Sequence, residues 1–498
     1  MRISCKRSYI MACCLLQGLL FLSCKKLVSI SGPIDTLTTE KMFNSEQQAE
    51  GAMIGVYHVM IHGTVSSNIV SVGFSSFSAG LATIAGGLSA GEFYNSNGPI
   101  SPSYYALITN RLTNDNSEVP GNIWSSAYNT VYGANSVIEG IATSTSPQLR
   151  DSVRKELTGE AKFVRAFCYF YLTNFFGDLP LALTVDFNQT AGVAKTSQPE
   201  IYKQIISDLL DAESTLPSDY SVGKGKRVRP NKWAATAMLA KAYLFLGDHV
   251  SAAAKATDVI NQAALYQLEP VNNVFKTTSR EVIWQLMQTE DPASALKNAT
   301  PEGNVFLPHI LYKEIAPFNL SDDLLRVFEP GDQRYVDWID STMNIVNGVS
   351  QGKTYYPAKY KVGFANSVAG APAEEYYVVS RLAEQYLIRA EARANGANGG
   401  LTGAIDDLNK VRKRAGLELL PVSMDLAAVK KAIAQERQTE LFAEWGNRWL
   451  DLKRTGTAHD VLSNTSIKQP WEGDYQLLYP IPPTEIQRNS RLTQNQGY

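Results

Sequence analysis

The chain has 498 residues, of which 44% are hydrophobic and 10% aromatic, and it carries 46 Lys and Arg against 48 Asp and Glu. This length allows more than one domain, because single cores stop growing beyond about 250–300 residues. Neither sign of charge gathers into a long run, so the composition excludes a nucleic-acid groove, which needs a basic face.

The first 24 residues predict export and lipidation. Basic residues mark Met1–Arg7, an apolar run covers Tyr9–Leu22, and Ser23 precedes Cys24, as is typical of a secretory signal. The run is shorter than the roughly 20 residues that span a bilayer. A small residue before cysteine resembles the bacterial lipobox, so we expect residues 1–23 to be removed and Cys24 to carry lipid. An ordinary signal with an incidental cysteine is the alternative.

Apolar periodicity predicts pairs of helices along the chain. Small residues at the contact between two helices, followed by a glycine turn, resemble the tetratricopeptide pattern, most clearly from Trp233 to Leu246 and on through Ala252 to Ile260. Less regular versions of the pattern predict three further pairs: 47–60 with 124–141, 160–176 with 201–216, and 382–394 with 404–416.

Two long stretches, residues 63–120 and 269–377, are irregular and contain only short strand-like runs at Val282–Met287 and Tyr376–Val379. Loops longer than about 12–15 residues are usually functional or disordered. Both stretches hold too many aromatic residues for simple disorder. We therefore expect them to carry the ligand-binding function.

The predicted helix from Ile433 to Leu452 combines an apolar stripe with many charges. Glu444 and Arg448 are four residues apart in the favourable order for an ion pair on a helix surface. The remaining charges favour a buried ion-pair network that joins the two halves of the chain, with a catalytic carboxylate pair as the alternative. These charges are Glu436, Arg437, Glu440 and Asp451.

No metal or cofactor site is predicted. Of five cysteines, only Cys168 lies outside the first 24 residues, and its aromatic neighbours indicate a buried position. Trp124, with Tyr128, Tyr132 and Asn135 at helical spacing, is assigned to the core in the same way. His58 and His62 lack the further ligands that zinc needs. Residues 348–354 miss a phosphate-binding loop by one position and predict a surface loop.

Several segments, in order along nearly the whole chain, resemble the SusD/RagB family. They are Gly159–Phe167 with Phe176–Pro180, Gln435–Gly456, and Tyr479–Tyr498. The resemblance implies an outer-membrane lipoprotein, facing the cell exterior, that captures nutrients, usually glycans, for a SusC-like TonB-dependent transporter. It implies no enzymatic activity. Lys25 and Lys26 follow the cysteine at positions where surface-exported members often have acidic residues. This departure weakens the expectation that the protein is displayed at the cell surface.

Ligand contacts are predicted on the aromatic loops, since a sugar ring packs its C–H face on a flat side chain while its hydroxyls need polar partners. The resemblance implies that the two irregular stretches approach each other over the helical scaffold. The candidates are Phe93, Tyr94, Asn97, Tyr104 and Tyr105 in the first stretch, and Tyr312, Trp338, Tyr355 and Tyr356 in the second.

The sequence thus predicts a mostly α-helical fold: a tetratricopeptide-like scaffold of helical hairpins with a loop-rich ligand-binding subdomain that contains a few short strands. An N-terminal half, 24–225, and a C-terminal half, 226–498, should pack as one unit. Two other functions stay open. A surface glycoside hydrolase would need two carboxylates about 5–9.5 Å apart, and a tetratricopeptide-type scaffold would bind only proteins.

Overall fold

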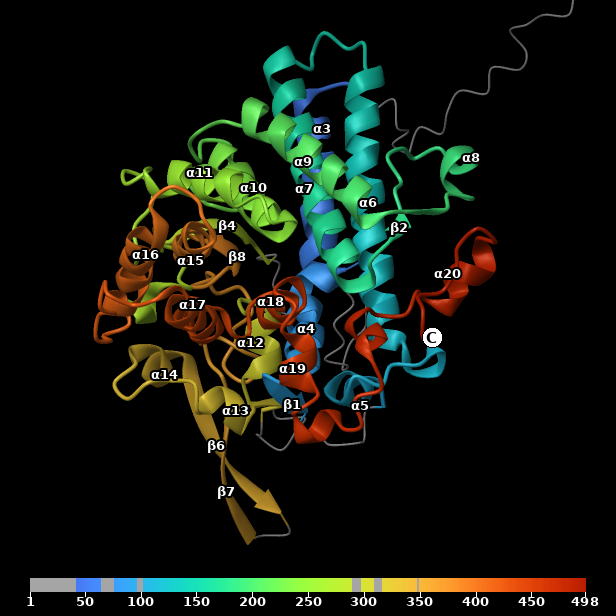
Figure 1. The fold of residues 1–498 in the computed structure, drawn as a ribbon. Helices are drawn as coiled ribbons and strands as arrows, with labels where there is room; N and C mark the ends of the chain where they lie inside the picture. Colours follow the sequence, from blue (N-terminus) through green and yellow to red (C-terminus); the bar gives the residue numbers. More distant parts are fainter. Residues whose placement is uncertain (1–41, 64–75, 96–101, 289–296, 309–315, 347–348) are drawn as a thin grey trace, which may run out of the picture.

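A computed structural model describes residues 42–63, 76–95, 102–288, 297–308, 316–346 and 349–498. The long helices form two groups that lie side by side (Figure 1). The first group is α3 (Glu46–His62), α6 (Glu118–Thr143), α7 (Asp151–Phe176) and α9 (Gln198–Thr215); the second is α10 (Lys232–Leu246), α11 (His249–Ile260), α15 (Leu382–Ala394), α16 (Gly400–Arg414) and α17 (Leu426–Leu441). The predicted signal, Cys24 and Lys25-Lys26 lie outside the described residues.

Each predicted helical pair is confirmed, and neighbouring pairs pack on one another. The contacts run from α3 and α6 through α7, α9, α10, α11 and α15 to α16. The turn between α10 and α11 shows how the sequence ends one helix and starts the next. Gly247 ends α10 with a φ of 75°, and the Asp248 side chain accepts from the Ser251 N–H over 3.0 Å to start α11. Glycine in this left-handed conformation and aspartate at a helix start are both favoured. The structure confirms the predicted mostly α-helical fold class.

The strands form four two-stranded antiparallel sheets. They pair β1 (Phe93–Asn95) with β5 (Phe318–Leu320), β2 (Leu179–Pro180) with β3 (Lys195–Thr196), β4 (Val282–Leu286) with β8 (Tyr377–Arg381), and β6 (Ile339–Val346) with β7 (Val349–Pro357). The two predicted strand-like runs are therefore β4 and β8, which pair with each other. The predicted loop at 348–354 is wrong for residues 349–354, because they form part of β7 in the hairpin at the bottom of Figure 1.

The two stretches predicted to be irregular hold several short helices. They are α4 (Ala82–Ala90), α5 (Pro102–Thr109), α12 (Pro301–Phe306), α13 (Asp322–Leu325) and α14 (Gln333–Trp338). Periodicity could not reveal α4, because residues 82–89 are all buried and the helix has no polar face. The other short helices are α8 (Phe187–Thr190), α18 (Asn447–Arg454), α19 (Ala458–Leu462) and α20 (Pro483–Arg488).

The predicted helix over 433–452 is wrong as one element, since the chain bends between α17 and α18. Ala443, Trp445 and Gly446 have φ values of 49°, 52° and 66°. At this bend the Trp445 N–H donates to the Thr83 hydroxyl over 2.8 Å. The bend also separates Glu444 from Arg448, so the predicted pair on one helix face does not form and Glu444 bonds Arg381 instead.

One apolar cluster joins residues from both halves of the chain. The Phe167 ring on α7 lies 5.4 Å from the Trp284 ring on β4 and 5.2 Å from the Trp445 ring. Cys168 and Trp124 are buried, which confirms their assignment to the core, whereas Tyr132 is exposed. The loop-rich region and the helical scaffold therefore share one apolar core.

Candidate ligand-binding site

The sheet of β1 and β5 brings the two aromatic stretches together. Its strands are antiparallel, and Tyr94 lies opposite Asn319. Just after β5, the Ser321 N–H donates to the Glu92 carbonyl over 2.8 Å, and the Ser321 hydroxyl donates to the Gly91 carbonyl over 2.7 Å. The approach of the two stretches that the family resemblance implies is therefore present.

Two tyrosines beside this sheet are open to solvent. Tyr94 on β1 is 41% exposed and Tyr105 on α5 is 43% exposed. The neighbouring Tyr104 on α5 is partly buried, and its ring meets the Phe318 ring edge-on at 5.3 Å. Partial burial and the Asp322 carboxylate raise the pKa of Tyr94, so its hydroxyl stays available as a hydrogen-bond donor. Tyr94, Tyr104 and Tyr105 are called the tyrosine cluster below.

Two predicted ligand residues lie in the core instead. Phe93 is 2% exposed, and its ring packs edge-on against Phe306 at 5.4 Å. Trp338 is 1% exposed, and its indole N–H donates to the Val271 carbonyl over 2.9 Å. Rings enclosed in this way offer no face to a sugar, so Phe93 and Trp338 are withdrawn from the predicted site.

The remaining aromatic candidates lie on β7. Tyr355 is partly buried, with its ring 6.4 Å from the Tyr335 ring. Tyr356 is buried, and its hydroxyl donates to the Asp340 carboxylate over 3.0 Å. Tyr355 remains a proposed contact, whereas Tyr356 is held by its own side-chain bond. The other two predicted residues, Asn97 and Tyr312, lie outside the described residues.

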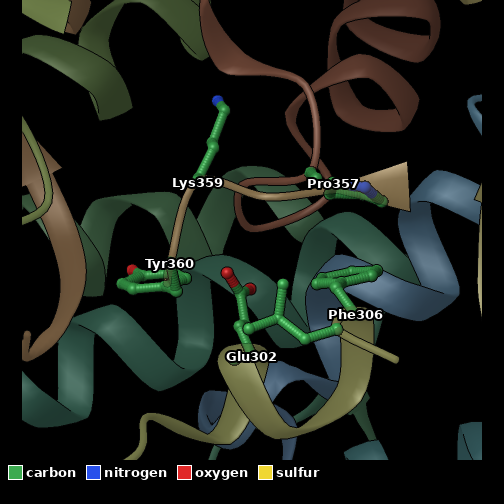
Figure 2. A pocket seen from close by; sticks show the side chains of 8 residues that line it. Glu302, Phe306, Pro357, Lys359 and Tyr360 are labelled. Atoms are coloured by element: carbon green, nitrogen blue, oxygen red, sulfur yellow. The ribbon is translucent and has the colours of Figure 1, made fainter. Parts of the chain in front are cut away.

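A small pocket lies between α12 and residues 357–360 (Figure 2). Glu302 and Phe306, both on α12, line it together with Lys359. The hydroxyls of Thr83 and Tyr377 donate to the Glu302 carboxyl group over 2.5 and 2.9 Å. Burial nevertheless raises the pKa of Glu302 to about 8, so the group is neutral at pH 7. Most of the lining residues are buried, so this pocket does not match the predicted glycan site on exposed loops.

The predicted ion-pair network is present and buried. Arg381 lies 2.9 Å from the Glu281 carboxylate and 2.8 Å from the Glu444 carboxylate, and it also pairs with Glu440. Burial acts to raise the pKa of Glu440, but the surrounding arginines lower it well below its usual value. Each of these carboxylates bonds a guanidinium group, as expected of structural rather than catalytic acids.

The predicted position of this network between the two halves is wrong. Its ion pairs, including those of Glu436, Arg437 and Asp451, all lie between residues 281 and 454. A different buried pair links the halves: Arg229 donates to the Glu160 carboxylate over 3.0 Å. The sequence did not reveal this contact, because residues 69 positions apart share no local pattern.

Within the described ranges, no group of three or more His, Cys, Asp and Glu could hold a metal ion. The His58 and His62 rings lie 4.6 Å apart. In the same part of the chain, no helix is both long and apolar enough to cross a bilayer.

A tetratricopeptide-like scaffold with an aromatic loop region defines the class of SusD-type proteins, and sequence comparison agrees. The family described as "SusD family" matches residues 326–498, and the family described as "Starch-binding associating with outer membrane" matches residues 90–244. The chain belongs to the SusD/RagB family.

Two named relatives match different shares of the chain. The SusD-like protein P2 of Formosa agariphila is 27% identical over 432 residues, which cover 78% of this chain and 83% of that protein. The starch-binding protein SusD of Bacteroides thetaiotaomicron is 31% identical over 134 residues, which cover 24% of this chain and 21% of that protein.

Solved structures share the fold. A laminarin-binding SusD-like protein superimposes with a TM-score of 0.73 at 24% identity, over 92% of this chain and 100% of the other. A SusD-like carbohydrate-binding protein from Bacteroides fragilis has a TM-score of 0.73 at 22% identity, over 91% of this chain and 100% of the other. At these identities the likeness shows the fold alone.

Proposed function

We propose that this protein binds a glycan at the outer-membrane surface and passes it unchanged to a SusC-like TonB-dependent transporter. Family membership supports the proposal, as do relatives described as starch-binding and laminarin-binding. The observation that carries it is the exposure of Tyr94 and Tyr105 beside a sheet that the core holds in place. A tyrosine offers an apolar face to sugar C–H bonds and a hydroxyl to sugar oxygens.

In this proposal, the protein binds its ligand without breaking any bond in it. The sequence left a catalytic pair open among the carboxylates of residues 433–452, without naming its members. Two of these carboxylates, Glu436 and Glu440, both bond Arg334 in the buried network. A glycosidase needs one carboxylate that is free to act as a nucleophile or base. The arrangement of these two groups favours a structural role, and we propose binding without catalysis.

Calorimetric titration tests the binding proposal. The chain without residues 1–24 is titrated with laminarin and with soluble starch, after a glycan array has ranked other polysaccharides. Tyr94→Ala and Tyr105→Ala should each weaken binding about tenfold, or roughly 1.4 kcal/mol, because each removes a stacking face. Tyr132→Ala is the matched control, since Tyr132 is also exposed but lies on α6.

Each other outcome of this experiment indicates a different function. Release of reducing sugar during the titration would identify a glycoside hydrolase. Absence of affinity for every glycan on the array, with retention of a peptide or protein partner, would identify a protein-binding scaffold. Equal effects of Tyr94→Ala and Tyr132→Ala would show that the tyrosine cluster is not the binding site.

We further propose that lipid on Cys24 anchors the protein, with the scaffold on the outer face of the membrane. Mass spectrometry of the native N-terminal peptide should find the acyl groups on Cys24, and Cys24→Ala should release the protein from membranes. Protease treatment of intact cells reports which leaflet carries it, the question that Lys25-Lys26 raise. Chemical cross-linking in the same cells should recover a TonB-dependent transporter.

A further inference from the structure

Lys468 is a fully buried lysine whose described partners are all neutral oxygens. It is fully buried at the end of a short 3-10 helix, Ser466–Lys468. Its ammonium donates to the carbonyls of Leu88 and Ser89 over 2.7 and 2.9 Å and to the Asn110 side-chain oxygen over 3.1 Å. Burial lowers the pKa of Lys468 well below its usual value. A buried polar group needs hydrogen-bond partners, so these bonds fix the position of the side chain.

The oxygens around Lys468 come from the C-terminal ends of two helices. Leu88 and Ser89 are in the last turn of α4, and Leu107, whose carbonyl lies 3.4 Å from the ammonium, is in the last turn of α5. The last carbonyls of a helix lack partners within the helix and carry partial negative charge. One lysine therefore joins the ends of α4 and α5.

The tyrosine cluster lies directly after α4 and within α5. Tyr94 on β1 follows α4 closely, and Tyr104 and Tyr105 are in the first turn of α5. Figure 1 shows β1 and α5 beside the C-terminal segment of the chain. The relative position of Tyr94 and Tyr105 thus depends on how α4 and α5 are held together.

Further bonds hold the same junction. The Asn110 side chain donates to the Ser89 carbonyl over 3.2 Å, and the Gln476 side chain donates to the Asn110 carbonyl over 2.8 Å. The hydroxyls of Ser89 and Tyr479 lie 2.9 Å apart. The segment from 468 to 479 therefore fixes the α4–α5 junction from more than 350 positions away in the sequence.

We propose that Lys468 is a positioning residue that sets the relative placement of Tyr94 and Tyr105 by joining the ends of α4 and α5. The inference rests on the proposed glycan-binding function for its meaning, but the placement itself is measurable without a ligand. Placing two ring faces in advance lowers the entropy lost when a ligand binds both.

Spin labels test the placement directly. In the chain without residues 1–24 the one remaining cysteine is the buried Cys168, so an introduced surface cysteine can be labelled selectively. Labels at position 94 or 105 are paired with a label at 132 on α6. Lys468→Met should broaden both distance distributions about twofold, by releasing the junction. A reference pair, 132 with the exposed position 250 on α11, should stay unchanged.

Unchanged distributions for 94 and 105 would overturn the inference, and so would equal broadening of the reference pair, which indicates general loosening. If Lys468→Met does not fold, Asn110→Gly provides the milder variant. It removes one acceptor of Lys468 and the donor to the Ser89 carbonyl, at a residue whose φ is 54°. The same broadening, to a smaller extent, is then expected. The spin-label distances are measured without a glycan. They therefore test the placement of Tyr94 and Tyr105 even if the proposed glycan-binding function is wrong.

Titration with laminarin or soluble starch, whichever binds, connects the placement with function. Lys468→Met should weaken binding about tenfold when Tyr94 is present. It should add little in a Tyr94→Ala background, because the residue acts through Tyr94 and the two changes are then not additive. Full additivity would show that Lys468 affects binding by another route and would contradict the inference.

Discussion

Glu302, a buried carboxyl group that is protonated at neutral pH, gives the stability of the protein a specific pH dependence. Burial raises its pKa to about 8, although Thr83 and Tyr377 donate hydrogen bonds to it. Unfolded, its pKa returns to about 4.3. The folded state therefore binds a proton that the unfolded state has lost between those pH values, so this contribution to stability is full at low pH and declines as pH rises toward 8.

Replacement of Glu302 by glutamine should remove this dependence. Between about pH 5 and pH 8, the free energy of unfolding of the parent should fall by on the order of 2–4 kcal/mol more than that of Glu302→Gln. Urea unfolding at several pH values measures the difference. Glu418→Gln, at an exposed position, should follow the parent, and parallel curves for the parent and Glu302→Gln would contradict the assignment.

Single residues could be predicted where local spacing decides their environment. Cys168 and Trp124 are buried because each lies on the apolar face of a long helix. Phe93 and Trp338 could not be assigned in this way, because loop residues are buried by partners distant in sequence. Glu302 lacks any catalytic motif, and its only local signal is the Thr-Pro pair before it, which marks a helix start.

The bend between α17 and α18 needs a close approach of two backbones. A Cβ on Gly86 of α4 would lie 2.5 Å from the Gly446 Cα. Gly86→Ala should therefore push the two segments apart and lower the free energy of unfolding by about 1–3 kcal/mol. Gly55→Ala in α3 meets no atom within 4 Å and should instead stabilise by about 0.5–1 kcal/mol. Urea unfolding of both variants measures this, and a stabilising Gly86→Ala would disprove the tight contact.

Helices were predictable where a polar face leaves a visible period, as in α11 and α16. The bend at 442–446 was not, because the apolar spacing of Leu441, Trp445 and Trp449 continues across it as if the helix were unbroken. Tertiary contacts with α4, such as the bond from Trp445 to Thr83, override the local preference there. Helix boundaries thus depend on tertiary contacts, which the periodicity of the sequence does not reveal.

At the scale of the molecule, each half of the chain supplies core packing and buried polar contacts to the other half. Phe167 packs against Trp284 and Trp445 from the other half. Glu160 is buried with its carboxylate bonded to Arg229. Lys468 reaches across to the ends of α4 and α5. We therefore propose that the boundary at 225 and 226 separates two sequence segments that fold as one packed unit.

Expression of 24–225 and 226–498 as separate chains tests this dependence. Alone, each fragment leaves a large apolar surface exposed, and the first leaves Glu160 buried without its cation, which costs about 3–5 kcal/mol in comparable buried pairs. Each should therefore lack cooperative unfolding and fixed aromatic circular dichroism when expressed alone. Co-expression should restore both signals in a one-to-one complex, because the interface is the core itself. A cooperative transition in either isolated fragment would show that its half contains a complete core, and the proposal of one packed unit would then fail.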